Sequence, residues 1–175
     1  MPMLGNIIKS LYGNQYTIGE LMNIDAGRQE RANSCQVKLI KTYHELKKES
    51  VLDKFRSLFG QPIVRMYYVI FKFEVTSNTG NSHIVIIKVN PDFNLNDWGN
   101  NKVKVYCSCP DFKYRSAYLL EKHNSLFIND KTKLALSESM LNAPKSTTKT
   151  TLLCKHSFAA LNWLIQNYIN IMKTI

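Results

Sequence analysis

The sequence predicts an α+β fold with N-terminal helices, a three-stranded antiparallel meander and a C-terminal helix. Three observations predict this fold. Apolar residues recur at helical spacing in the first 60 residues, alternate residues are apolar in segments after Pro62, and an apolar stripe at helical spacing returns between Ser157 and Met172. The 175 residues are 45% hydrophobic and 21% charged, so the chain can bury a sizeable core.

Residues 1–60 are predicted to form a helical region that packs on or beside the core. Apolar residues have helical spacing over residues 3–11. Residues 17–20 have the form of a capping box, in which the side chains of Thr17 and Glu20 each accept a hydrogen bond from the backbone amide of the other residue. Two longer helices are expected over residues 37–48 and 50–59. The first of them would place on one face Val37, Ile40 and Tyr43.

Residues 61–175 form the second predicted region, which begins with three strands. Residues 63–76 have apolar side chains at alternate positions and are rich in β-branched and aromatic types, which predicts a strand. Further strands are expected over residues 83–89 and 102–106. Because short local segments connect these strands, we expect an antiparallel meander.

A basic insert over residues 110–153 separates the third strand from the last helix. Within it, residues 111–122 are compatible with a helix, and residues 143–151 are rich in Ser, Thr and Lys and are expected to form a loop. The last helix is predicted over residues 157–172. Its apolar stripe consists of Leu161, Leu164, Ile165, Tyr168, Ile169 and Met172.

Three cysteines and a histidine form two short pairs at the ends of this insert. Cys107 and Cys109 end the third strand, where residues i and i+2 project to the same side. Cys154 and His156 start the last helix, where unpaired amides favour a thiolate. Three sulfurs and one imidazole complete the tetrahedral shell of Zn²⁺, so we predict a zinc ion that fixes the last helix to the third strand. A disulfide between Cys154 and one of the other two cysteines is the alternative.

The pairs resemble a SWIM-type zinc finger, whose pattern is CxC, a variable spacer and CxH within a strand–strand–helix unit. The resemblance covers residues 83–172, and the spacer of 44 residues is longer than is usual for that family. More narrowly, the segment 107–117, the basic insert and the Cys-Lys-His triplet resemble phage-encoded proteins, some of which are regarded as virion or structural proteins. This resemblance implies a location in the virion, and in the cytoplasm of the infected bacterial host during assembly.

Catalysis is not expected from this set of residues. Four protein ligands leave no open position on the metal, whereas catalytic zinc usually keeps one. The sequence also lacks a P-loop, a Gly-x-Ser-x-Gly motif, a His-Glu-x-x-His motif and the zinc deaminase signature. We therefore predict that the protein is not an enzyme.

The positive charge is concentrated near the predicted zinc site. The formal net charge is +10, and residues 113–156 hold eight basic and three acidic side chains. Tyr114 and Tyr118 could stack beside this charge. The candidate contacts to the phosphate backbone of DNA are Lys113, Arg115, Lys145, Lys149 and Lys155. Alternatively, these cations offset the charge of a zinc–thiolate centre and otherwise face solvent.

Two function classes follow from these observations. The favoured one is a zinc-stabilised, non-enzymatic structural or assembly protein of a phage particle, in its head, neck or tail-connecting ring. Its partners would be other virion proteins or copies of itself, and apolar residues of the N-terminal helices would form the contact. Alternatively, these helices only cover the sheet of their own chain. The alternative is a SWIM-type module that binds nucleic acid. No membrane span and no signal peptide are expected, because no long uncharged apolar run occurs.

Overall fold

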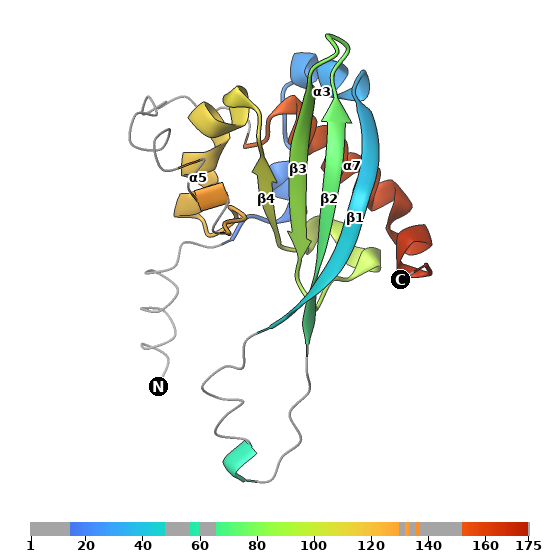
Figure 1. The fold of residues 1–175 in the computed structure, drawn as a ribbon. Coiled ribbons are helices and arrows are strands. Elements are labelled where there is room, and N and C mark those ends of the chain that lie inside the picture. Colours follow the sequence, from blue (N-terminus) through green and yellow to red (C-terminus); the bar gives the residue numbers. More distant parts are fainter. Residues whose placement is uncertain are drawn as a thin grey trace.

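The computed structural model describes residues 15–47, 57–59, 66–129, 132, 133, 136 and 152–174. In this part of the chain, four strands form one antiparallel sheet, and a long helix lies across one face of it (Figure 1). In their order across the sheet, the strands are β1 (Gln36–Leu46), β2 (Tyr67–Thr76), β3 (Ser82–Val89) and β4 (Val103–Cys107). The helix is α7 (Lys155–Met172). The α+β class is therefore confirmed, but the sheet has four strands instead of the three predicted.

β1 occupies the segment for which a helix was predicted over residues 37–48, so that prediction is wrong. Val37 and Leu39 alternate as expected for a strand and pack against the core. Ile40 has no partner in β2 because the register shifts there, which is a β-bulge. The bulge inverts the alternation, so Tyr43 lies on the opposite face of the sheet. Val37, Ile40 and Tyr43 are three residues apart in the sequence, which is the spacing of one face of a helix, and this led to the wrong prediction.

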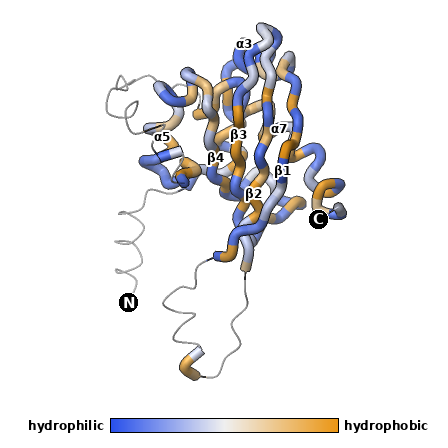
Figure 2. The backbone as a smooth tube through the Cα atoms, viewed as in Figure 1, coloured by the Kyte–Doolittle hydropathy of each residue, from blue (hydrophilic) through white to orange (hydrophobic). Residues whose placement is uncertain are grey.

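The three predicted strands are confirmed as β2, β3 and β4, although residues 63–65 lie outside the described part. Figure 2 shows hydrophobic and hydrophilic residues alternating along them. One face of the sheet packs on α7. The rings of Phe73 and Trp163 lie edge-to-face with their centroids 5.7 Å apart, and the ring centroids of Phe71 and Tyr168 are 6.0 Å apart. These aromatic pairs join the sheet to the helix and form the centre of the core.

The two edges of the sheet differ. The backbone of Val105 in β4 accepts a hydrogen bond from Phe127 and donates one to Ser125, so residues 125–127 cover that edge. β1 forms the other edge and pairs only with β2 among the described residues. Its bulge and its exposed Lys38 and Lys41 are features that discourage edge-to-edge aggregation.

Short helices lie at the ends of the sheet and beside its β4 edge (Figure 1). α2 (Ile18–Leu21) begins with the predicted capping box, which is confirmed: Thr17 Oγ1 accepts from the Glu20 amide at 3.2 Å, and Glu20 Oε2 accepts from the Thr17 amide at 2.7 Å. The other short helices are α3 (Ala26–Asn33), the 3₁₀ helix η1 (Leu95–Asn100), the π-helix η2 (Phe112–Ser116) and α5 (Ala117–Lys122). The helix expected over residues 111–122 and the last helix are thus confirmed.

Several predicted features lie outside the described residues. They are the helix over residues 3–11, most of the helix over residues 50–59, and the loop over residues 143–151. The grouping of the chain into regions 1–60 and 61–175 stays a prediction, although β1 places part of the first region in the sheet.

The core contact between β2 and α7 should dominate stability. Phe73 is fully buried, and Phe73→Ala would leave a cavity opposite Trp163. We expect the free energy of unfolding to fall by about 3–5 kcal/mol. The control Lys38→Ala removes an exposed side chain of β1 and should change it by less than about 0.5 kcal/mol. Urea unfolding of both variants would measure the difference, and equal midpoints would contradict this account of the core.

Candidate metal centre

The two sequence pairs come together at the junction of β4 and α7. The ligand atoms of Cys107, Cys109, Cys154 and His156 all lie within 4.8 Å of one another, and all four residues are buried. All four cysteines of the chain are free, so no disulfide competes for these sulfurs. Cys35 is the fourth cysteine and lies outside the cluster. The four residues predicted as ligands could therefore hold one metal ion.

The strand β3 positions the first pair. Cys107 is the last residue of β4. The next residue, Ser108, makes two hydrogen bonds to Ile84 of β3: its amide donates to the Ile84 carbonyl at 2.9 Å, and its Oγ accepts from the Ile84 amide at 3.0 Å. The chain then turns into η2, whose first amide, that of Phe112, donates to Cys109 Sγ at 3.3 Å. These hydrogen bonds hold the chain between Cys107 and Phe112 in place, and both sulfurs belong to the cluster.

The second pair is positioned by the start of α7. Cys154 is the N-cap residue, and its Sγ accepts from the Ser157 amide at 3.4 Å. The Ser157 hydroxyl lies 3.1 Å from the same sulfur. From the other side, Arg28 Nη1 of α3 donates to the Leu153 carbonyl at 2.9 Å, which holds the residue before Cys154. Such hydrogen bonds orient metal ligands and stabilise a thiolate.

The three thiols interact electrostatically. Burial raises the pKa of Cys107 well above its usual value, and hydrogen bonds with Cys109 and Cys154 add to this. A hydrogen bond with Cys107 lowers the pKa of Cys109. A hydrogen bond with Cys154 and the burial of the thiol together outweigh that effect and raise the pKa to about 12. Burial opposes ionisation of Cys154 too, yet hydrogen bonds from Cys107 and Cys109 hold its pKa well below the usual value. A bound dication is what would ionise all three.

The imidazole of His156 also fits a metal ligand. The residue is only 5% exposed, and neither ring nitrogen has hydrogen-bond geometry to a partner among the described residues. Its ring lies beside that of His83, with the centroids 4.5 Å apart. An unpaired buried nitrogen is unfavourable by about 1–3 kcal/mol, and a metal bond would remove that cost. With three sulfurs, this nitrogen makes the donor set of structural zinc sites.

The predicted cations divide into three groups. Arg115 and Lys155 line a cavity of about 280 Å³ that also borders Cys109 and His156. Lys113 precedes them on η2 and does not line the cavity. Lys145 and Lys149 lie outside the described residues. Tyr114 and Tyr118 are about half exposed, as stacking would require.

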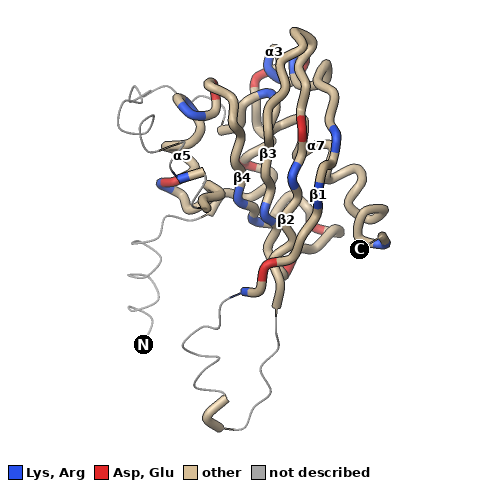
Figure 3. Tube along the Cα trace, viewed as in Figure 1, with Lys and Arg blue, Asp and Glu red and all other residues tan. Residues whose placement is uncertain are grey.

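Two further arginines of this cavity were missed by the sequence analysis. Arg28 and Arg31 belong to α3, which packs on α7 although more than 120 residues separate them in the chain. Figure 3 shows basic positions, in blue, at α3. Their segment was described only as a polar stretch, and no local pattern links it to the cysteine pairs.

Comparisons with protein-family models, with curated proteins and with solved structures found no match. The resemblance to SWIM-type zinc fingers thus stays a hypothesis based on the motif and its geometry. In the described part of the chain, no helix is long and apolar enough to span a membrane.

Two buried serines provide a matched test of ligand orientation. Ser157 touches Cys154 Sγ, whereas the Ser116 hydroxyl has no hydrogen-bond partner among the described residues. We expect Ser157→Ala to weaken zinc binding by about tenfold or more, and Ser116→Ala to leave it unchanged. Competition with a chromophoric chelator would measure both affinities. Equal affinities would show that the hydroxyl does not orient the ligand.

Proposed function

We propose that the chain is a zinc-stabilised structural module and not an enzyme. The observation that carries this proposal is the buried set of three sulfurs and one imidazole at one point of the core. Four protein ligands would close the coordination shell of Zn²⁺ and leave no position for a substrate or a catalytic water. The metal would then act as a cross-link.

The position of the cross-link supports a structural role. Cys107 and Cys109 follow β4, whereas Cys154 and His156 belong to the start of α7. The ion would therefore tie together two elements that are separated by a 44-residue insert. Closing such a long loop through a metal restricts the unfolded chain, and metal-binding free energy becomes folding free energy.

The SWIM-type hypothesis is supported by the arrangement of the elements. β3, β4 and α7 follow one another as a strand–strand–helix unit, with CxC after the second strand and CxH at the start of the helix. This is the order that the resemblance implies. We therefore keep the SWIM-type assignment as part of the proposal.

An assembly role, in a phage particle, is the second part of the proposal. It is supported by Leu58 and Phe59, whose side chains are 79% and 80% exposed. Adjacent large apolar side chains on a surface are typical of contacts with another polypeptide. The occupant would be a second copy of this chain or another virion protein.

The metal prediction tests the first part. Purified protein should contain a single zinc ion per chain, and Cys109→Ser and His156→Ala should lose it, because three ligands close the shell incompletely. The matched control is Cys35→Ser, which removes a cysteine outside the cluster. Elemental analysis measures the metal. Structural zinc contributes on the order of 10 kcal/mol in finger peptides, so chelation should also unfold the β4–α7 junction.

A closed shell has a further signature in the same samples. With Co²⁺ in place of Zn²⁺, the visible spectrum should be that of a tetrahedral thiolate site, and added azide should not change it. A spectrum that responds to azide would reveal an open position and contradict the structural role. Zinc-free protein that is fully folded would contradict the metal itself.

The assembly prediction uses the two exposed apolar residues. Leu58→Asp and Phe59→Asp should abolish self-association or incorporation into particles and leave the zinc content unchanged, because a buried carboxylate at a contact is unfavourable. Ile169→Asp, at an exposed apolar position of α7, is the control. Multi-angle light scattering measures the mass. Wild-type protein that stays monomeric at high concentration, and is absent from particles of its source, would rule out assembly.

A further inference from the structure

A basic cavity beside the metal centre carries an inference that goes beyond the structural role. Four cationic side chains line it, from α3, η2 and α7: Arg28, Arg31, Arg115 and Lys155. Asp111 is the only carboxylate among the lining residues that the structure describes. Because these side chains come from three elements far apart in the sequence, the charge is gathered by the fold and not by a local run of basic residues.

The ion pairs leave part of this charge unbalanced. Arg115 pairs with Asp111, with Nε and Oδ1 3.1 Å apart, and Arg28 lies 3.6 Å from Asp25. By contrast, neither Arg31 nor Lys155 has an ion-pair partner within the described ranges. Arg28 is also only 8% exposed, so its charge is largely removed from water. A buried or gathered positive charge of this kind calls for an anion.

The metal centre would balance only one of these charges. Three thiolates and one Zn²⁺ carry a net charge of −1, as two positive and three negative charges sum. The lining residues carry four positive charges and one negative charge, and Asp25, which pairs with Arg28 from outside the lining, adds a second negative charge, so the net is +2. The cavity would therefore keep about one positive charge with the zinc bound, so neutralisation of the thiolates does not account for all the cations.

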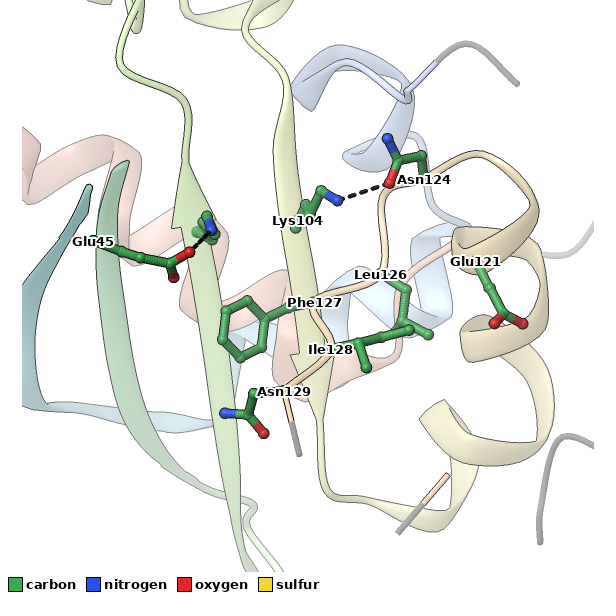
Figure 4. A pocket seen from close by; sticks show the side chains of 9 residues that line it. Glu45, Lys104, Glu121, Asn124, Leu126, Phe127, Ile128 and Asn129 are labelled. Atoms are coloured by element: carbon green, nitrogen blue, oxygen red, sulfur yellow. Dashed lines mark hydrogen bonds and ion pairs between the residues drawn. The ribbon is translucent and has the colours of Figure 1, made fainter. Parts of the chain in front are cut away.

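A second cavity of the protein shows what a balanced site looks like. It has a volume of about 300 Å³ and lies on the sheet between β1, β3 and the segment before Asn129 (Figure 4). There Lys88 donates to Glu45 at 2.7 Å, and Lys104 donates to Asn124 Oδ1 at 2.7 Å. Its lining contains two lysines and two glutamates, so it has no net charge. Of these two cavities in the described part of the chain, only the one at the candidate metal centre has an excess of cations.

We propose that the cavity at the metal centre binds a phosphate group. About one unbalanced positive charge matches a phosphate monoanion, and Arg31 and Arg115 offer planar forks of N–H donors that suit its oxygens. The cavity also borders the first turn of α7, an 18-residue helix whose N-terminal dipole end favours an anion. A volume of about 280 Å³ accommodates a phosphate and part of the group that carries it. The phosphate could belong to a free phosphate or monoester, or to a nucleic-acid backbone.

The test uses full-length, zinc-loaded protein and two probes. Inorganic phosphate and a fluorescent oligothymidylate are titrated at 50 mM salt. Arg31→Gln and Lys155→Gln remove the two cations without ion-pair partners, and each should weaken binding about tenfold, as expected for a charge-assisted hydrogen bond. Lys38→Gln, on β1 and away from the cavity, is the matched control and should bind as the wild type does. Zinc content and circular dichroism must be unchanged in all three variants.

The outcomes separate the two sources of the phosphate. Binding of inorganic phosphate alone supports a free phosphate or monoester, whereas oligothymidylate binding that inorganic phosphate displaces supports a nucleic-acid backbone. In the second case, each lost cation should also reduce the slope of log affinity against log salt by about 0.7. Absence of binding to both probes overturns the proposal. It is equally overturned if Arg31→Gln and Lys155→Gln bind like the wild type, or if Lys38→Gln weakens binding as much as they do. Neither result bears on the zinc, which is measured separately.

Discussion

Three sulfurs and an imidazole meet in a buried space where the end of β4 lies against the start of α7. Cys107 and Cys154 are fully buried, and the ligand atoms of the cluster lie within 4.8 Å of one another. Without a cation, such a group is unfavourable in a core, because burial raises the pKa of the Cys107 thiol well above its usual value and the imidazole of His156 has no hydrogen-bond partner among the described residues. With a dication, the same four groups would become the strongest link between β4 and α7. The sign of their contribution therefore depends on the metal.

This dependence matters because α7, which carries two of the four residues, also packs on the sheet. α7 is the helix that covers its inner face among the described elements, and Phe71 and Phe73 pack against it. The start of α7 is fixed by Cys154 as the N-cap and by the Arg28 bond to Leu153. A shift of this helix would displace the ligands and the aromatic contacts together. The proposed metal and the core therefore stabilise the same placement of α7.

Local patterns predicted most of the described fold and the four residues that form the buried cluster. The strands β2 to β4, the capping box at Thr17 and the last helix follow from spacing and residue type, which act over a few neighbours. β1 was missed because one bulged residue, Ile40, shifts the alternation by one position. Arg28 and Arg31 were missed because their place in the cavity depends on packing between α3 and α7. The spacing of residue types within a segment does not show which distant segments that segment will contact.

The candidate metal centre and the basic cavity have two residues in common, so the chemistry of one affects the other. Cys109 and His156 line the cavity, and Lys155 lies between two of the proposed ligands in the sequence. In the proposed closed shell, the zinc has no free position, so an anion in the cavity would meet the cations and not the metal. Yet the cations come from α3, η2 and α7, and the proposed zinc fixes α7 and the start of η2 to the end of β4. The ion would then set the spacing of the cations without touching the anion, so a structural metal could govern binding at the cavity.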